Sequence, residues 1–432
     1  MFNIDYIRDN KEEYLSNLRK RGLNIDLDII LKLYDEKTVL QRNFDDIQKK
    51  RNDIAKLVNS GSEPKDKLLK DGKDLKIKSL KVQKDLKKKS DLLLKYLSIL
   101  PNRISNDMPA GIDEKGNVEI KKVGKIPNFD FEIKDHIELG IKNDLLDFEK
   151  SSKVSGSRFY YIKNDLVLLQ LSLFNFVLSK LLSKGFSPII PPELVKEQAL
   201  FGTGYFPSEK DQIYKLENSN IEDKNSLYLI GTSEVPLVSY HQGEILDENI
   251  LPIKYVGLSH CFRSEVGSWG KDVKGMKRVH QFEKIEMVVF TDEKSSYQIH
   301  DELLSIEEEI LSDLNLPYHV LNMCTGDVSL QTYKKYDVEV YIPSVNEYME
   351  VYSNTNTVDY QSRRLNIKYK DKDGKIKFVH ILNATALTNT RPLIAIMENY
   401  QTKDGKIRLP DVLVPFMANR EFIGKDKNEN SL

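Results

Sequence analysis

The stretch GLSHCFRSEVGSWGKDVKGMKRVHQFEKIE, from Gly257 to Glu286, decides the fold of this chain. Its two ends carry apolar residues at strand-like spacing, which indicates β-strands. Its middle holds three glycines among charged residues, which is typical of a long loop. The stretch therefore predicts two antiparallel strands joined by a polar loop.

A charged pair, Arg263 and Glu265, lies near the end of the first predicted strand, and Glu286 closes the second. Strand alternation predicts that Arg263 and Glu265 share a face. An arginine in this position can bind a phosphate or a carboxylate through two parallel hydrogen bonds. On spacing alone, a solvated ion pair explains the two residues equally well, because exposed pairs are common and contribute little.

The order of residues along this hairpin favours a binding site. The pattern R-x-E-x-G-S-x-G, followed by R-x-H-Q-F-x-K-x-E, resembles motif 2 of the class II aminoacyl-tRNA synthetases, and among them the seryl-tRNA synthetases. The match is long and gapless, and similar patterns cover nearly the whole chain. The resemblance implies an α+β fold, in which an antiparallel sheet is flanked by helices and preceded by an N-terminal antiparallel coiled-coil hairpin.

The composition excludes several classes of protein. A chain of 432 residues suggests two or three domains. The net charge of −1 excludes a uniformly basic nucleic-acid-binding protein, so any basic surface must be local. Cys261 and Cys324 are too few and wrongly placed for a disulfide framework or a zinc site. We therefore expect a reducing, cytoplasmic location and no zinc.

The sequence also argues against targeting to a membrane. The N-terminus is charged from the start and already helical in character, so we expect no secretory leader. The most apolar segment, 166–182, is interrupted by Gln170, Asn175 and Lys180, which favours a buried helix over a membrane span. We therefore expect a soluble protein with no membrane partner.

Residues 1–105 are predicted to be helical almost throughout. Apolar residues recur at alternating spacings of four and three around 40–54 and again around 75–100, which makes imperfect heptads. The breaker NSGSEP, at 59–64, lies between them, and Pro101 ends the second run. The pattern predicts two long helices that fold back as an antiparallel hairpin, with its tip near 59–64.

The returning helix of this hairpin is strongly basic. Between residues 65 and 89 it holds eleven lysines and four aspartates, a net charge of +7. A solvated lysine-rich face is the ordinary explanation. The resemblance implies instead that the arm binds tRNA(Ser), through phosphate contacts and shape more than through base reading. Family analogy alone extends this to tRNA(Sec).

The resemblance also sets the expected domains. Residues 1–105 correspond to the tRNA-binding arm, and 106–150, rich in proline and glycine, to a linker and the start of the globular part. Residues 151–425 correspond to the catalytic domain. The last residues, 426–432, are predicted to form a disordered tail.

Two further motifs fall inside the expected catalytic domain. Residues 165–195 read as an apolar helix, a short strand and two prolines, and resemble motif 1, which builds the dimer interface in this family. Residues 381–401 read as a strand, a small-residue turn and a helix that begins near Arg391, and resemble motif 3. Motif 2 is the stretch 257–286. A homodimer is therefore implied by the resemblance, not by spacing.

Two shorter patterns lie between these motifs. Thr232 and Glu234 are two residues apart, and an ordinary helix N-cap with an acidic first turn would explain them. In the family, this T-x-E loop contacts the serine substrate. Glu350 and Ser353 lie in a predicted strand, where an isolated glutamate is ordinarily just solvated. The family positions that they match hold a magnesium ion on the ATP phosphates, and oxygen ligands suit that ion.

The resemblance implies the site residue by residue. The catalytic residues would be Arg263, Arg391 and Glu350. The serine-binding residues would be Thr232, Ser233, Glu234, Arg263, Glu286, Asn383 and Thr385. The ATP-binding residues would be Arg263, Ser264, Glu265, Val279, Phe282, Glu350, Val351, Tyr352, Ser353 and Arg391. Glu350 and Ser353 would hold magnesium, which together with ATP would complete the set of cofactors.

The chain departs from the common bacterial form of motif 3. Ala384, Ala386 and Thr390 stand where glycines are usual, and Pro392 follows Arg391 where threonine is usual. The N-A-T form resembles that of eukaryotic and archaeal relatives, and proline is tolerated in the first turn of a helix. We therefore expect activity to be retained.

The implied activity is that of a serine–tRNA ligase, which activates L-serine with ATP to seryl-adenylate and transfers it to the 3′ end of tRNA(Ser). Two alternatives remain. One is a related ligase that activates an amino acid for a carrier protein, and the long basic arm argues against it. The other is a non-catalytic RNA-binding or scaffold protein with a retired synthetase domain. The intact Arg263, Glu265, Glu350 and Arg391 argue against that alternative.

Overall fold

The computed structural model describes residues 4–60, 64–217, 226–267 and 274–425. These residues fold as two compact units, Met1–Pro101 and Asn102–Leu432. Each unit contains a hydrophobic cluster built from its own residues. The predicted tail, 426–432, lies outside the described residues.

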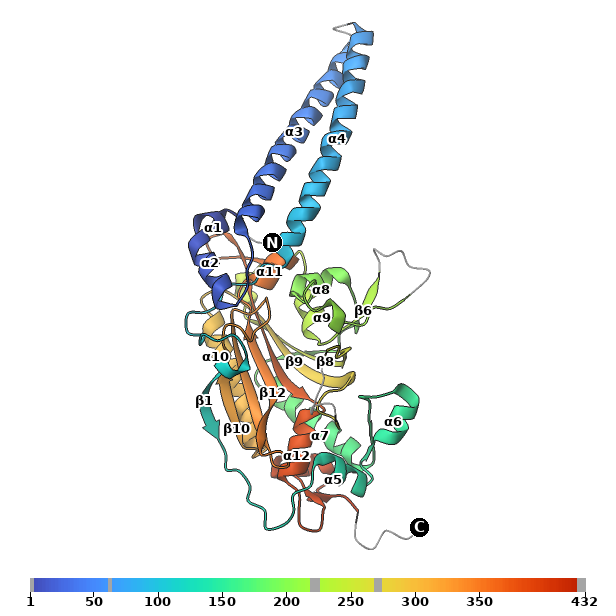
Figure 1. The fold of residues 1–432 in the computed structure, drawn as a ribbon, viewed down its shortest axis with the longest axis vertical. Helices are drawn as coiled ribbons and strands as arrows, with labels where there is room; N and C mark the ends of the chain where they lie inside the picture. Colours follow the sequence, from blue (N-terminus) through green and yellow to red (C-terminus); the bar gives the residue numbers. More distant parts are fainter. Residues whose placement is uncertain (1–3, 61–63, 218–225, 268–273, 426–432) are drawn as a thin grey trace. The chain divides into compact units, whose positions relative to one another are not determined.

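The first unit consists of the helices α1 (Ile4–Asp9), α2 (Lys11–Lys20), α3 (Leu27–Ser60) and α4 (Lys65–Ser98). Helices α3 and α4 are each 34 residues long and run side by side in opposite directions (Figure 1). The structure therefore confirms the predicted antiparallel helical hairpin. Part of its predicted tip, 61–63, lies outside the described residues.

A small hydrophobic cluster closes the base of this hairpin. Leu18 of α2, Ile30 of α3 and Leu97 of α4 are buried together there. The buried Tyr14 hydroxyl donates a hydrogen bond to Pro101 O at 2.6 Å. Burying a leucine or isoleucine side chain stabilises a fold by roughly 1.5–3 kcal/mol, so this base is the firmest part of the unit.

Polar pairs join the two long helices farther from the base. Lys89 Nζ lies 2.5 Å from Glu36 Oε2, and Gln48 Nε2 donates to Ser79 Oγ at 3.2 Å. Exposed ion pairs of this kind contribute little stability. The distal helices therefore depend on their pairing along the hairpin and present mostly solvated surface.

The second unit is organised around an eight-stranded sheet with the order β1-β10-β11-β12-β15-β9-β8-β4. All neighbouring strands are antiparallel except β4 and β8, which are parallel. The α+β class and the antiparallel sheet are thus confirmed. The strands are β1 Val118–Val123, β4 Ser187–Ile189, β8 Ile253–Phe262, β9 Gln281–Thr291, β10 Tyr318–Asn322, β11 Lys334–Ile342, β12 Glu347–Asn356 and β15 His380–Thr388.

Three helices supply most of the apolar cover of this sheet: α7 (Asp165–Ser183), α10 (Ser296–Asp313) and α12 (Arg391–Asn399) (Figure 1). Helix α10 is amphipathic and buries Ile299, Leu303 and Ile306. Its buried face contacts β12 and β15. A packed hydrophobic core between these helices and the sheet therefore supports the strands that carry the candidate site.

Helix α7 is long and apolar enough to cross a membrane by length and composition alone. The same composition is typical of the core helix of a soluble protein. Here Leu166, Leu173 and Val177 are fully buried in the main hydrophobic cluster, whereas Leu168 and Leu171 remain 44% and 54% exposed. The helix therefore has one face in the core and one apolar face exposed on this chain.

Smaller elements complete the second unit. The helices are α5 His136–Lys142, α6 Phe148–Ser155, α8 Glu197–Thr203, α9 Glu234–Ser239 and α11 Tyr360–Leu365. The short strands are β2 Leu146–Asp147, β3 Tyr161–Ile162, β5 Leu194–Lys196, β6 Leu227–Leu229, β7 Ile245–Asp247, β13 Lys368–Lys370, β14 Ile376–Phe378, β16 Ile407–Arg408 and β17 Phe422–Ile423. One-turn 3₁₀ helices occur at Glu114–Gly116, Lys210–Gln212 and Glu248–Ile250, and a longer one at Asp411–Met417.

The structure corrects one prediction about motif 3. Asn383, Ala384 and Ala386 do not form a turn; they continue the central strand β15, with a β-bulge between Thr385 and Leu387. Small residues suit this strand because it is buried between β12 and β9, and both alanines are fully buried. The chain leaves the strand only after Thr388, and α12 begins at the predicted Arg391 with Pro392 in its first turn.

Candidate active site

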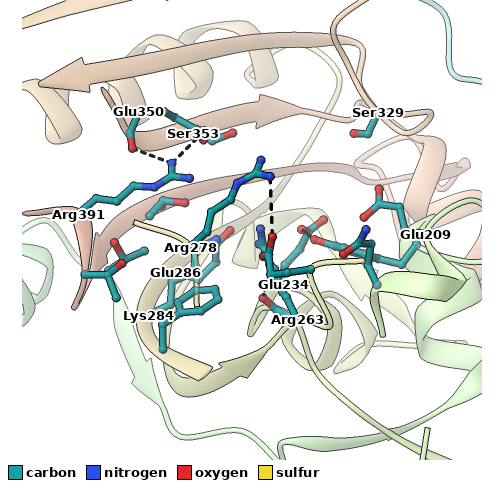
Figure 2. Close-up of a pocket in the computed structure, with 18 of the residues that line it drawn as sticks. Glu209, Glu234, Arg263, Arg278, Lys284, Glu286, Ser329, Glu350, Ser353 and Arg391 are labelled. Carbon is teal, nitrogen blue, oxygen red and sulfur yellow. Dashed lines mark hydrogen bonds and ion pairs between the residues drawn. The ribbon is translucent and has the colours of Figure 1, made fainter. Parts of the chain in front are cut away.

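A pocket of about 590 Å³ opens on the sheet where β11, β12, β15 and β9 lie side by side. Its wall is completed by the start of α12 and by a loop that contains Tyr205 and Glu209. Figure 2 shows Arg391, Glu350 and Ser353 grouped at one end of the pocket. The labelled Glu234, Arg263 and Glu286 lie together in another part of it.

The first strand of the predicted hairpin ends at Phe262, one residue before Arg263. Glu265 has φ +51°, so the backbone there is no longer extended. Strand alternation therefore does not place Glu265, and that step of the sequence argument is wrong. Both side chains nevertheless line the pocket, because the chain turns around it. Part of the predicted loop, 268–273, lies outside the described residues.

Arg263 is held between the backbone at Gly231 and a side chain of β9. Its Nε donates to Gly231 O at 3.4 Å, and its guanidinium lies 5.4 Å from the centre of the Phe282 ring. A cation over an aromatic face is attracted by the ring. Arg278, on the return limb of the loop, lies 4.0 Å from Glu265 Oε2. Two guanidinium groups and one aromatic ring therefore face the same recess.

Arg391 begins α12 and contacts Glu350 of β12. Its Nη1 donates to Glu350 O at 2.7 Å and to Glu350 Oε2 at 3.1 Å, as the dashed lines in Figure 2 mark. Its Nε donates to Lys277 O at 3.5 Å. The N-terminus of a helix carries a partial positive charge, which adds to the charge of the guanidinium. This end of the pocket is therefore suited to an anion.

Glu350 keeps 40% of its side chain exposed, because it faces the open pocket. Burial alone would raise the pKa of this carboxyl, but the charges of Arg391 and Lys335 lower it to about 2. Lys335 Nζ in turn lies 2.9 Å from Asp337 Oδ2 on β11. Glu350 is therefore ionised at neutral pH and available as an oxygen ligand.

Glu234 lies at the start of α9 and is only 4% exposed. Gln361 Nε2 and Asn383 Nδ2 donate to its Oε1 at 2.7 and 3.1 Å, and the Tyr205 hydroxyl donates to its Oε2 at 3.0 Å. All three donors are neutral. Burial, aided by the charge of Glu286, raises the pKa of Glu234 to about 7. This carboxyl is therefore a site where a cationic group of a ligand would be favoured.

Glu286 lies on β9, opposite Thr385 of β15. Its Oε2 is 2.5 Å from Lys284 Nζ, and the Lys284 Nζ also donates to Thr232 Oγ1 at 3.3 Å. Burial raises the pKa of Glu286, and the charge of Lys284 offsets only part of that rise. This corner of the pocket therefore combines a carboxyl, hydroxyls and an amide, a set that can hydrogen-bond a small polar ligand.

Comparisons with known proteins agree with this arrangement. The model of the tRNA synthetase class II core domain (G, H, P, S and T) matches residues 214–400, and the model of the seryl-tRNA synthetase N-terminal domain matches residues 1–104. A serine–tRNA ligase of Treponema denticola is 42% identical over 421 residues, which cover 96% of this chain and 98% of that protein. The chain belongs to the seryl-tRNA synthetase family.

Solved structures extend the match to this family. Seryl-tRNA synthetase from Pyrococcus horikoshii complexed with ATP has a TM-score of 0.87 and 37% identity, and the match covers 99% of this chain and 100% of that one. The cytoplasmic serine–tRNA ligase from Naegleria fowleri in complex with AMP has a TM-score of 0.83 and 28% identity, with coverage of 98% and 99%. The predicted fold and the predicted enzyme class, an ATP-dependent aminoacyl-tRNA ligase, are thereby confirmed.

Most of the residues implied by the resemblance to seryl-tRNA synthetases line the pocket. They are Glu234, Arg263, Glu265, Val279, Phe282, Glu286, Glu350, Val351, Ser353, Asn383, Thr385 and Arg391. Long-range pairing explains why they meet, because β9, β12 and β15 are neighbours in the sheet although they are far apart in the sequence.

Four residues implied by the resemblance do not line the pocket. Thr232 lies behind Lys284, and the buried Ser233 Oγ donates to Gly257 O at 3.4 Å. The remaining two are Ser264, whose hydroxyl donates to Asp211 O, and Tyr352, whose side chain is fully buried beside Glu307. These four residues can therefore contact a ligand only through their backbone atoms or after a side chain moves.

Several residues that shape this seryl-tRNA synthetase pocket are not among those predicted from the sequence. Lys284 lies within the stretch 257–286, two residues before Glu286, so strand alternation predicts that the two side chains share a face. Lys335 is likewise two residues from Asp337 on one strand. Gln361 gave no signal, because it reaches Glu234 from α11, a helix 127 residues farther along the chain.

The residues at the Glu350 end fit the chemistry of magnesium. Glu350 and Ser353 both line the pocket and offer a carboxylate and a hydroxyl oxygen, the ligand type that this ion prefers. Among the described residues, no group of three or more His, Cys, Asp and Glu side chains is placed to hold a metal by itself. A magnesium ion here would therefore take its other ligands from a bound nucleotide and water. Cys261 and Cys324 are free and buried.

Proposed function

We propose that this chain is a serine–tRNA ligase that activates L-serine with ATP and transfers the seryl group to tRNA(Ser). The observation that carries the proposal is a single pocket that has an anion-binding end at Arg391 and a second part where Arg263 lies with the carboxyls of Glu234 and Glu286. The anion-binding end, with Arg391, suits the triphosphate. The other end, with Glu234 and Glu286, suits a small amino acid that carries a hydroxyl.

The first step forms seryl-adenylate. A carboxylate oxygen of serine attacks the α-phosphorus of ATP, and the bond from that phosphorus to the bridging oxygen of pyrophosphate breaks. Arg263 is placed to contact both the serine carboxylate and the α-phosphate, which holds two like charges together. Phe282 offers a face for the adenine ring, and Glu265 can accept a hydrogen bond from its amino group. No side-chain nucleophile is needed.

The outer phosphates meet the cationic end of the pocket. Arg391 would exchange its contact with Glu350 for the γ-phosphate, and Arg278 adds a second guanidinium. When bound by Glu350 and Ser353, magnesium would neutralise charge on the phosphates and so assist the departure of pyrophosphate. In the second step the terminal ribose hydroxyl of tRNA attacks the serine carbonyl, and AMP leaves.

Serine selection follows from the polar corner of the pocket. Glu234 would bind the α-ammonium group, while Glu286, Asn383 and Thr385 would hydrogen-bond the serine hydroxyl. A site built to hydrogen-bond a hydroxyl rejects an analogue that lacks it, because buried polar groups are then left unpaired. Alanine and glycine should therefore be poor substrates.

The KM for serine should rise as the pH falls from 8 to 6. The pKa of Glu234 is raised to about 7, chiefly by burial, so the neutral carboxyl predominates below pH 7 in the free enzyme. A neutral carboxyl binds an ammonium group weakly, and the KM should increase by up to about tenfold per pH unit below the pKa. Steady-state kinetics of pyrophosphate exchange at pH 6, 7 and 8 measure this.

The KM for ATP at each pH is the control, since Glu350 stays ionised over this range. Glu234→Gln should show a high KM for serine at every pH, with the slope removed. A KM for serine that is constant in the wild-type protein, or a slope that survives Glu234→Gln, would contradict the assignment.

The proposal assigns residues 1–105 to a tRNA-binding arm, 106–150 to a linker and the start of the globular part, and 151–425 to catalysis. The lysines between residues 65 and 88 of α4 are all exposed, which supports a role in binding RNA phosphates. Charging of tRNA(Sec) rests on family analogy alone. We also propose a cytoplasmic location, with no membrane association.

We further infer a homodimer that forms through motif 1. The exposed apolar side chains of α7, Leu168, Leu171 and Leu182, continue to Ile190 just after β4, which is 84% exposed. Contiguous exposed apolar surface is typical of protein interfaces. A second copy of the chain would cover them.

Serine-dependent ATP–pyrophosphate exchange without tRNA tests the proposed function. We expect exchange with serine, and exchange at least about 100-fold weaker with alanine, glycine and threonine. Exchange with a different amino acid would keep the enzyme class and overturn the substrate. The absence of exchange with all four would favour the non-catalytic scaffold, and seryl transfer to a carrier protein in place of tRNA would favour the other alternative.

A further inference from the structure

His136 and Glu398 form a buried pair that lies outside the pocket and has no part in the reaction described above. His136 Nδ1 is 3.1 Å from Glu398 Oε1, and the side chains are only 4% and 0% exposed. A buried carboxyl is costly unless its oxygens are hydrogen-bonded. The contacts of this pair therefore show which parts of the fold it holds.

Each polar end of the pair has a partner. Glu398 Oε1 also accepts from His136 N at 3.0 Å, and Oε2 accepts from Ser344 N at 3.1 Å. His136 Nε2 accepts from Met276 N at 3.3 Å. An amide N–H can only donate, so Nε2 carries no proton, and the proton on Nδ1 is donated to Glu398. The imidazole is therefore a bridge between Glu398 and the backbone at Met276.

The Met276 end of this bridge lies next to the anion-binding end of the pocket. Met276 directly precedes Lys277 and Arg278, which both line the pocket, and Lys277 O accepts the hydrogen bond from Arg391. Gly275 comes so close to the imidazole that a Cβ there would lie 2.1 Å from His136 Nε2. Its φ of +72° also favours glycine. The return limb of the loop is thus seated directly on His136.

The other end of the bridge holds the elements that carry Arg391 and Glu350. Glu398 lies seven residues after Arg391 on α12, which is close to two turns, so the two project from nearly the same face of the helix. Ser344 lies in the connection between β11 and β12, and β12 carries Glu350. One buried pair therefore contacts all three segments that bring Arg278, Arg391 and Glu350 to the pocket.

We propose that His136 and Glu398 are positioning residues that fix the return limb of the β8–β9 loop against α12 and thereby set the affinity for ATP. They touch no substrate and act through Lys277, Arg278 and Arg391. The inference rests on the proposed function, because it assumes that this end of the pocket binds ATP. It predicts an effect on ATP and not on serine, since the serine corner is built from other segments.

Two substitutions of His136 test its hydrogen bond to Glu398 and its hydrogen bond from Met276 separately. His136→Asn places an amide near Nδ1, which keeps a donor for Glu398 but has no atom to accept from Met276. His136→Gln reaches to the position of Nε2 and can accept from Met276. We expect His136→Asn to weaken ATP binding, and to raise the KM for ATP, by about tenfold, the effect of one lost buried hydrogen bond. His136→Gln should stay within about threefold of wild type.

Gly275→Ala tests the same contact from the loop side. The new methyl group must displace the imidazole or the loop, so it should weaken ATP binding as His136→Asn does. His319→Asn is the matched control. His319 contacts the carboxylates of Glu119 and Glu339 at 2.7 Å each, on strands at the far edge of the sheet, and it is not among the residues that line the pocket. It should lower thermal stability and leave ATP affinity unchanged.

Calorimetric titration of the full-length proteins with ATP and magnesium, together with the KM for ATP and for serine in pyrophosphate exchange, decides the inference. A tenfold loss of ATP affinity in His136→Asn, with the KM for serine within about twofold and rescue by His136→Gln, supports it. Unchanged ATP affinity overturns it, as does an equal loss in His319→Asn. If His136→Asn does not fold, Gly275→Ala gives the answer. A wild-type protein that binds no ATP would refute the proposed function itself.

Discussion

Arg263→Ala should lower serine-dependent ATP–pyrophosphate exchange by at least about 1,000-fold. Removing a single group that stabilises charge in a transition state typically costs 10²- to 10³-fold, and Arg263 would contact both the attacking carboxylate and the α-phosphate. Arg263 is held by Gly231 O and the Phe282 ring, so its loss removes a guanidinium at this one position. Arg263→Lys should recover little, because a lysine lacks the planar pair of donors.

The matched control for this prediction is Arg408→Ala. Arg408 is an exposed arginine that pairs with Asp411 at 2.9 Å on the same unit, and it should leave exchange unchanged. Exchange rates are best compared as kcat/KM for ATP and for serine, with thermal melting to verify the fold of each variant. Exchange by Arg263→Ala within about tenfold of wild type would remove Arg263 from its assigned role.

Excision of the distal arm should separate the two half-reactions. Replacing residues 37–88 by a short glycine–serine turn, just beyond the Glu36–Lys89 pair, keeps the hydrophobic base with Ile30 and Leu97. Pyrophosphate exchange should stay within about twofold, because the described pocket is built only from the second unit. Charging of tRNA(Ser) should fall by about 100-fold or more, since many lysine–phosphate contacts are lost together.

A variant that keeps the arm but removes positive charge tests whether the loss of tRNA charging comes from the lysines or from the new turn. Changing Lys81, Lys84, Lys87 and Lys88 to glutamine keeps both helices and removes four exposed positive charges. It should weaken charging and flatten its dependence on salt, while exchange is unaffected. Equal loss of exchange and charging in either variant would refute the assignment of the arm to tRNA.

The long helices and the hairpin of motif 2 could be predicted from the sequence because their signals are local. Heptad spacing and the NSGSEP breaker are enough to place α3 and α4. The edge strand β1 lies within the expected linker and gives little local signal, because its side chains are almost all exposed and three of its six residues, Glu119, Lys121 and Lys122, are charged. Only pairing with β10 makes it a strand.

In the pocket, too, features with local sequence signals could be predicted and features that depend on long-range contacts could not. Residues within a recognised motif, such as Arg263 and Arg391, could be named in advance, whereas the left-handed backbone at Glu265 and the reach of Gln361 to Glu234 could not. Both depend on the tertiary fold, which overrides local periodicity. The sequence predicts a turn at Ala384 and Ala386 for a related reason, since no local pattern marks them as strand residues and their place in a buried central strand depends on the tertiary fold.

The hydrophobic base of the arm has a consequence for how such an enzyme can evolve. Because that cluster is made only from residues of the first unit, changes along the distal helices leave the packing of the catalytic unit untouched. If the arm binds tRNA as proposed, mutation can therefore change its RNA-binding surface while the catalytic unit stays unchanged. The two units of the protein are therefore free to diverge at different rates.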